Sequence, residues 1–159
     1  MNIGSYTFEA FLQRAAEFHG HAAPGLILGG YMVAEARRHL PENTIFDALS
    51  ETPKCLPDSI QLLTPCSIGN GWLKIINLGR FALALYDKYT GEGVRVYLDP
   101  AKLANWPEIQ AWFFKLKPKK AQDLNLLLQE IRQAGSKICG IEAAQSAAIL
   151  SAESTPTVS

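Results

Sequence analysis

Two short segments carry the side chains best suited to bind a metal ion. His19, Gly20 and His21 form the first segment, and Cys55 and Cys66, eleven residues apart, form the second. Neutral imidazole and thiolate are ligands of zinc and related metals, and two of each complete a tetrahedral set. The sequence therefore predicts one mononuclear metal site built from both segments.

Each segment taken alone also has an ordinary structural explanation. Short histidine motifs often arise by chance, with one ring capping a helix and the other at the surface. Free cysteines are often small buried hydrophobes, and the chain contains no Cys-x-x-Cys pair. Asp58 either begins a helix or orients a ligating histidine. Cys139 has apolar neighbours, which indicates a buried structural thiol.

Hydrophobic periodicity gives the elements that must position these residues. Helices are predicted over residues 6–18, 24–40, 57–64, 107–116 and 119–134. Strands are predicted over residues 44–51, 72–76, 80–89 and 94–98. Turns at 77–79 and 90–93 favour an antiparallel meander for the last three strands. We expect an α+β fold with helices flanking an antiparallel sheet, in one domain over residues 1–150, followed by a flexible tail at 151–159.

Composition and charge restrict the classes of partner. The 159 residues are 48% hydrophobic and 19% charged, as in a globular domain, and 15 basic residues balance 15 acidic ones. Such a balance gives no electrostatic reason to expect nucleic acid or an anionic membrane as partner. We expect no transmembrane segment and no secretion signal. Three cysteines, an odd set, indicate reduced thiols and a cytoplasmic location.

Three blocks, in order along the chain, resemble the FmdE family, which is named after the E component of formylmethanofuran dehydrogenase. Residues 18–29, FHGHAAPGLILG, are similar to its signature Phe-x-Gly-His-x-Cys-Pro-Gly-Leu-x-Leu-Gly. Residues 55–71, CLPDSIQLLTPCSIGNG, resemble its Cys-x-x-Asp-x-Ile-Gln, Thr-Gly-Cys and Gly-x-Gly elements. Residues 90–96, TGEGVRV, resemble its Thr-Gly-x-x-Val-Arg segment. Three ordered blocks are far more specific than any one of them.

The resemblance implies an α+β core, a homodimer and a metal-containing pocket that includes His21, Cys55 and Cys66. Ala23 stands where the family has a cysteine, and His19 is the candidate to replace that ligand. Many relatives carry a C-terminal zinc-binding segment with paired cysteines, which has no counterpart here, so the chain resembles the core domain alone. The namesake protein accompanies a molybdenum or tungsten enzyme that oxidises formylmethanofuran.

Three functional hypotheses follow. The first is a metal-binding protein, accessory to a redox or metallocofactor system and binding zinc, nickel or iron, in a larger redox-enzyme complex. The second is a stand-alone enzyme in which an open zinc site activates water. The third is a dithiol–disulfide pair of Cys55 and Cys66, which their spacing disfavours. Four protein ligands would favour the first hypothesis, and three would favour the second.

Overall fold

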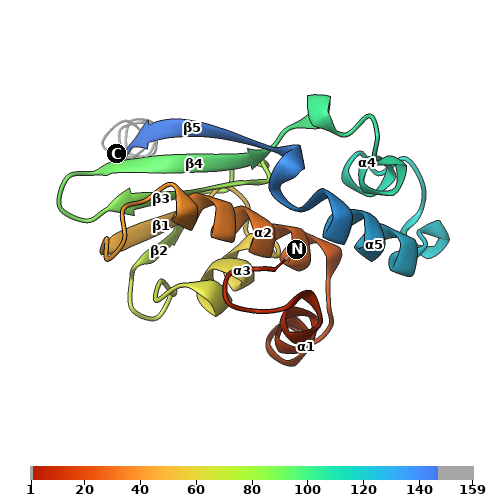
Figure 1. Ribbon diagram of the computed structural model, residues 1–159, viewed down its shortest axis with the longest axis horizontal. Coiled ribbons are helices and arrows are strands. Elements are labelled where there is room, and N and C mark those ends of the chain that lie inside the picture. The colour runs from red at the N-terminus through yellow and green to blue at the C-terminus, as the bar shows by residue number, and fades with distance from the viewer. Residues whose placement is uncertain (1, 147–159) are drawn as a thin grey trace, which may run out of the picture.

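The computed structural model describes residues 2–146, which form helices and one five-stranded sheet (Figure 1). The α-helices are α1 Phe8–His19, α2 Pro24–Arg38, α3 Leu56–Leu63, α4 Pro107–Phe113 and α5 Leu124–Ala134. Short 3-10 helices are η1 Pro100–Lys102, η2 Lys119–Ala121 and η3 Gly135–Ile138. The strands are β1 Phe46–Ser50, β2 Leu73–Ile75, β3 Ala82–Asp87, β4 Glu92–Leu98 and β5 Cys139–Gln145. The predicted tail at 151–159 and the predicted domain end at 150 lie outside the described residues.

The sheet has the order β2-β1-β3-β4-β5 and is antiparallel except between β1 and β2. The predicted α+β fold with a largely antiparallel sheet is therefore confirmed. The meander is wrong at one point, because β2 does not pair with β3. It pairs in parallel with β1, with Ala48 opposite Leu73, since α3 returns the chain to the same end of the sheet as a parallel crossover requires.

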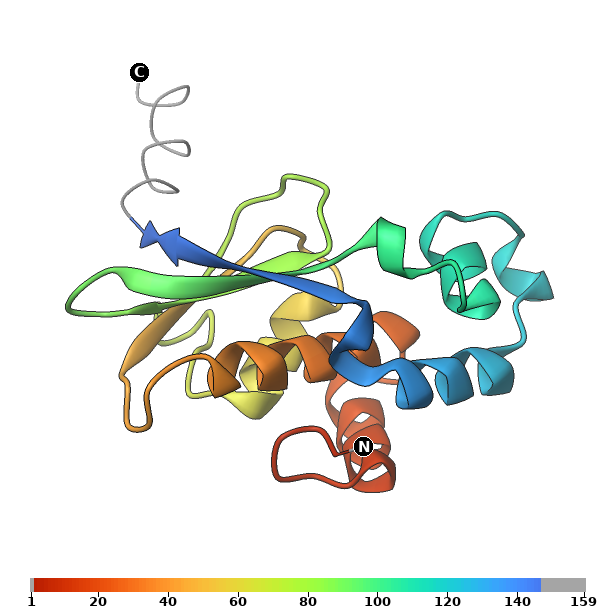
Figure 2. The same cartoon turned by 45° about the horizontal axis from the view of Figure 1, so that its top comes forward.

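Helix α2 lies against one face of the sheet, with α3 and α5 on the same side (Figure 2). The predicted alternation in β3 and β4 is confirmed on this face, where Leu83, Leu85, Val94 and Val96 are buried in the main core. The opposite face holds a smaller cluster of Leu49, Ala84 and Tyr86. The helices thus form one layer that holds the predicted metal-binding segments at its edge.

Two expected boundaries differ in the C-terminal part. The helix predicted over 119–134 divides into η2 and α5, because the side chain of Asp123 accepts the Leu126 N–H at 3.1 Å and begins a new helix. Strand β5 was not predicted, since its residues show no apolar alternation. It forms because β4 offers a free edge along its whole length, from Leu98 opposite Cys139 to Glu92 opposite Gln145.

A buried ion pair lies on the sheet face away from the helices. Arg95 of β4 donates to both carboxylate oxygens of Glu51, at 2.6 and 3.0 Å, and the Glu51 side chain is only 4% exposed. This contact raises the pKa of Arg95. Arg95 also reaches Glu142 of β5 at 2.9 Å. One guanidinium therefore connects three neighbouring parts of the sheet.

No helix within residues 2–146 is long and apolar enough to cross a membrane.

Candidate metal centre

His19 and His21 lie on either side of the residue that ends α1. Gly20 adopts φ 97°, in the left-handed region that glycine enters without strain, and its N–H donates to the Ala16 carbonyl. The bend brings the two imidazole ring centroids to 5.2 Å. Two imidazoles on one tetrahedral zinc ion, with Zn–N near 2.0–2.1 Å, have centroids about 5 Å apart. The two rings are therefore spaced as one metal ion requires.

A carboxylate orients the first of these histidines. Asp58 lies in the first turn of α3, and its Oδ2 is 2.6 Å from His19 Nδ1. Gln61 Nε2 donates to the other oxygen of Asp58 at 3.3 Å. A carboxylate at Nδ1 keeps the proton of a neutral imidazole on that nitrogen and leaves Nε2 free to bind a metal. Asp58 thus both begins the helix and contacts the ring, which are the two roles considered for it.

Cys55 lies against the beginning of α2. A Cβ atom on Gly25 would be 3.1 Å from both Cβ and Sγ of Cys55, so a glycine at this position leaves the space that the thiol occupies. Trp112 is 3.4 Å from the same point and forms a further wall. The half-buried thiol therefore lies between the first turn of α2 and the ring of Trp112.

Burial raises the pKa of the Cys55 thiol, and the Asp58 carboxylate raises it further. Lys119, Lys54 and a backbone hydrogen bond from Leu26 act in the opposite direction. Because only the thiolate is a metal ligand, a bound metal must displace this proton. The positive end of the α2 dipole favours the resulting negative charge.

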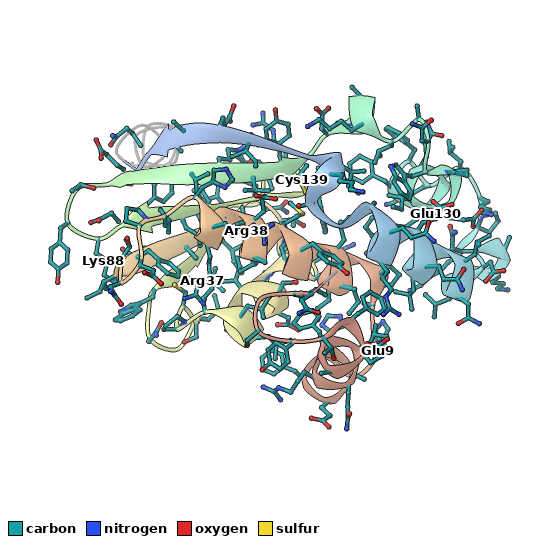
Figure 3. The ribbon with its side chains drawn as sticks, in the orientation of Figure 1. Glu9, Arg37, Arg38, Lys88, Glu130 and Cys139 are labelled. Carbon is teal, nitrogen blue, oxygen red and sulfur yellow. The ribbon has the colours of Figure 1, made fainter. Side chains whose placement is uncertain are left out.

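Cys66 lies away from the other predicted ligands. It is fully buried, and its thiol donates to the Phe46 carbonyl at 3.4 Å. The eight residues of α3 separate it from Cys55, a length of about 12 Å, whereas two thiolates on one zinc ion are about 4 Å apart. Its charged neighbours include Lys88 and Arg37, which Figure 3 shows close together and far from Glu9 of α1. The four predicted ligands do not meet in this arrangement.

Within residues 2–146, no group of three or more histidine, cysteine, aspartate or glutamate side chains is close enough to hold a metal ion. The donor types fit zinc, nickel or iron, and the pair His19–His21 fits the spacing of a shared ion. Cys55 is in the same neighbourhood, because its thiol feels the charge of the Asp58 carboxylate that contacts His19.

The remaining cysteine and histidine are outside this neighbourhood. Cys139 begins β5, is 3% exposed, and burial raises the pKa of its thiol to about 12, which confirms a buried thiol. His39 caps the end of α2, where its Nδ1 is 3.0 Å from the Glu35 carbonyl. Both residues therefore serve as matched controls for experiments on the candidate centre.

Sequence reasoning missed two residues that build the centre. Gln61 holds Asp58 and also accepts the Ile68 N–H at 3.2 Å, which fixes the segment after α3. Its spacing of three residues from Asp58 on a predicted helix was a usable signal. Trp112 reaches Gly25 from a helix more than eighty residues away in the sequence. A tryptophan in an amphipathic helix gives no local sign of such a contact.

Comparison with known proteins gives three findings. The family described as "FmdE, Molybdenum formylmethanofuran dehydrogenase operon" matches residues 18–146. The crystal structure of an FmdE-like protein of the tungsten formylmethanofuran dehydrogenase type, from Syntrophus aciditrophicus, is 49% identical, with a TM-score of 0.84 over 91% of this chain and 75% of that one. A probable S-adenosyl-L-methionine-binding protein of Archaeoglobus fulgidus is 35% identical over 96 residues, which are 55% of this chain and 26% of that protein. The chain thus spans about a quarter of that curated relative.

Proposed function

Because the chain belongs to the FmdE family, we propose that it is a cytoplasmic metal-binding protein, accessory to a molybdenum or tungsten redox enzyme. One observation carries the metal-binding part. His19 and His21 are spaced as ligands of one ion, and a carboxylate contacts Nδ1 of His19. The accessory part rests on the name of the similar Syntrophus aciditrophicus protein.

The proposed ligands are His19, His21 and Cys55, with Asp58 orienting His19. Two imidazoles and one thiolate suit zinc first, and nickel or iron(II) next. Cys66 completes the four-ligand set that the sequence predicts. In the arrangement of the structure it is too far from Cys55 to bind the same ion, so the number of protein ligands is the quantity to measure.

A second candidate function follows from that count. With three protein ligands, the fourth position of a tetrahedral zinc ion is open to water, whose pKa zinc lowers to about 7. The chain would then be a metal-dependent enzyme that generates hydroxide. The position of Cys66 at the far end of α3 favours this alternative, whereas a fourth ligand would close the site.

Loading the purified chain with zinc, nickel and iron(II) in separate experiments tests the proposal. We expect one tightly bound ion per chain after dialysis, measured by elemental analysis, because the two histidines are already spaced for it. Cobalt(II) loading should add a thiolate-to-cobalt absorption band, and added azide should change this spectrum if one position is open. Retention of none of the three metals above the level of a bovine serum albumin control would refute metal binding.

We also propose that the chain forms a homodimer, as the family resemblance implies. Exposed large hydrophobic residues on α4, α5 and the segment between them support this proposal, among them Phe114, Leu116 and Leu124, which are 45%, 67% and 49% exposed. Light scattering at micromolar concentrations should give twice the 17.4 kDa of one chain. A mass of one chain at every concentration would contradict the dimer.

A further inference from the structure

A second hollow lies beside the candidate metal centre. It has a volume of about 340 Å³ and is enclosed by the segment after β1 and the segment before β3. This size is within the range of pockets that bind small molecules. Polar and cationic side chains line one part of it and aromatic rings the other. They are Thr52, Lys54, Asn77 and Arg80, and Phe81 and Phe113.

The charge of this pocket is positive. Its lining contains two cationic side chains, Lys54 and Arg80, and no acidic one. Among residues 2–146, Lys54 has no ion-pair partner. The acid nearest to Arg80 is Glu51, at 3.9 Å, which is beyond hydrogen-bond distance. Arg95 already occupies both oxygens of Glu51. The guanidinium of Arg80 and the ammonium of Lys54 therefore keep donors for an added anion.

The walls of the pocket are held by backbone hydrogen bonds. The Glu51 carbonyl accepts the N–H groups of Leu78 and Arg80, which fixes the segment before β3. On the other side, Ser50 Oγ donates to the Thr52 carbonyl at 2.7 Å. Because both segments are fixed before a ligand arrives, binding costs less ordering of the chain.

The aromatic wall connects the pocket to the candidate metal centre. Phe81 and Trp112 meet edge to face with ring centroids 5.9 Å apart, and Trp112 lies 6.3 Å from Phe113. Trp112 in turn lies against the point where Gly25 meets Cys55. A ligand held by its anionic end near Lys54 would therefore extend along these rings toward the Cys55 thiol.

We propose that this pocket binds a small anionic molecule with a flat apolar ring, as a carboxylate or a phosphate ester. The anionic group lies between Lys54 and Arg80, and the ring packs on Phe81 and Phe113. The inference deepens the proposed function by naming the class of ligand that approaches the metal, and it rests on that function only for this proximity. Binding itself requires no metal.

Calorimetric titration of the full chain tests the pocket, with 2-naphthoate and 2-naphthyl phosphate as anionic ring probes. Inorganic phosphate supplies the charge without the ring, and 2-naphthalenemethanol supplies the ring without the charge. We expect either anionic ring probe to bind at least about tenfold more tightly than both partial probes. Arg80→Gln should weaken that binding about tenfold, since it removes a charged hydrogen-bond donor. Phe113→Leu should weaken it through the ring, and exposed Lys74→Gln on β2 should leave it unchanged.

Equal affinity of wild type and Arg80→Gln for both anionic ring probes would overturn the proposal. So would inorganic phosphate binding as tightly as those probes. Titrating chelator-treated and metal-loaded protein separates this inference from the proposed function. A chain that takes up no metal still binds the probes if the pocket is assigned correctly. If the pocket assignment is wrong, Arg80→Gln leaves probe binding unchanged while wild type still takes up its metal.

Discussion

Arg95→Met is expected to lower the free energy of unfolding by about 3 kcal/mol. Glu51 is 4% exposed and takes two hydrogen bonds from the Arg95 guanidinium. Methionine retains the aliphatic length of arginine but leaves the Glu51 carboxylate buried without its main partner. The remaining cation, Arg80, is 3.9 Å away and mostly exposed, so it compensates little. In a domain of this size the melting temperature should fall by about 6–12 °C.

Glu142→Gln is the matched control, because Glu142 is the other partner of Arg95 and is 53% exposed. An exposed ion pair contributes at most about 1 kcal/mol, so urea unfolding of this variant should differ little from wild type. The double variant Glu51→Leu with Arg95→Met should recover most of the loss, since it removes both charges. If Arg95→Met were as stable as Glu142→Gln, the buried pair would not have the structural role described here.

His21→Ala and Cys55→Ala are each expected to lower zinc affinity by more than the roughly 10–100-fold that loss of a contact behind a ligand costs. Each variant removes one of three proposed ligands. The His21 side chain is exposed, so its removal leaves the packed core intact. Competition against a chromophoric chelator measures the affinity, and circular dichroism confirms that the variants remain folded.

Matched controls separate ligand loss from general effects. His39→Ala and Cys139→Ala should retain wild-type zinc affinity, because neither residue lies near the centre. Asp58→Asn should lose about 10–100-fold, as it changes the contact that orients His19. Cys66→Ala then counts the ligands. Unchanged affinity supports three ligands and an open position, and a loss like that of Cys55→Ala supports a closed four-ligand site. Full zinc affinity in both His21→Ala and Cys55→Ala would refute the proposed centre.

Local patterns were sufficient for most of the fold. Pro24 at the first position of α2 and the alternation of Leu83 and Leu85 in β3 depend on near neighbours in the chain, so the sequence shows them directly. The partner of β2 does not depend on near neighbours. A predicted helix between two predicted strands was the available signal for a parallel pair, and the turn residues at 77–79 favoured a hairpin instead.

The sequence by itself determined the family, the α+β class, the identity of the candidate ligands and the bend at Gly20 that brings His19 and His21 together. Each of these depends on residue type and on short spacing along the chain. Only the tertiary structure decided which distant side chains meet. It placed Asp58 on His19 and Trp112 beside Cys55, and α3 held Cys66 away from both. The physical reason is that helix length and helix packing, rather than separation in sequence, set the distance between the two ends of α3.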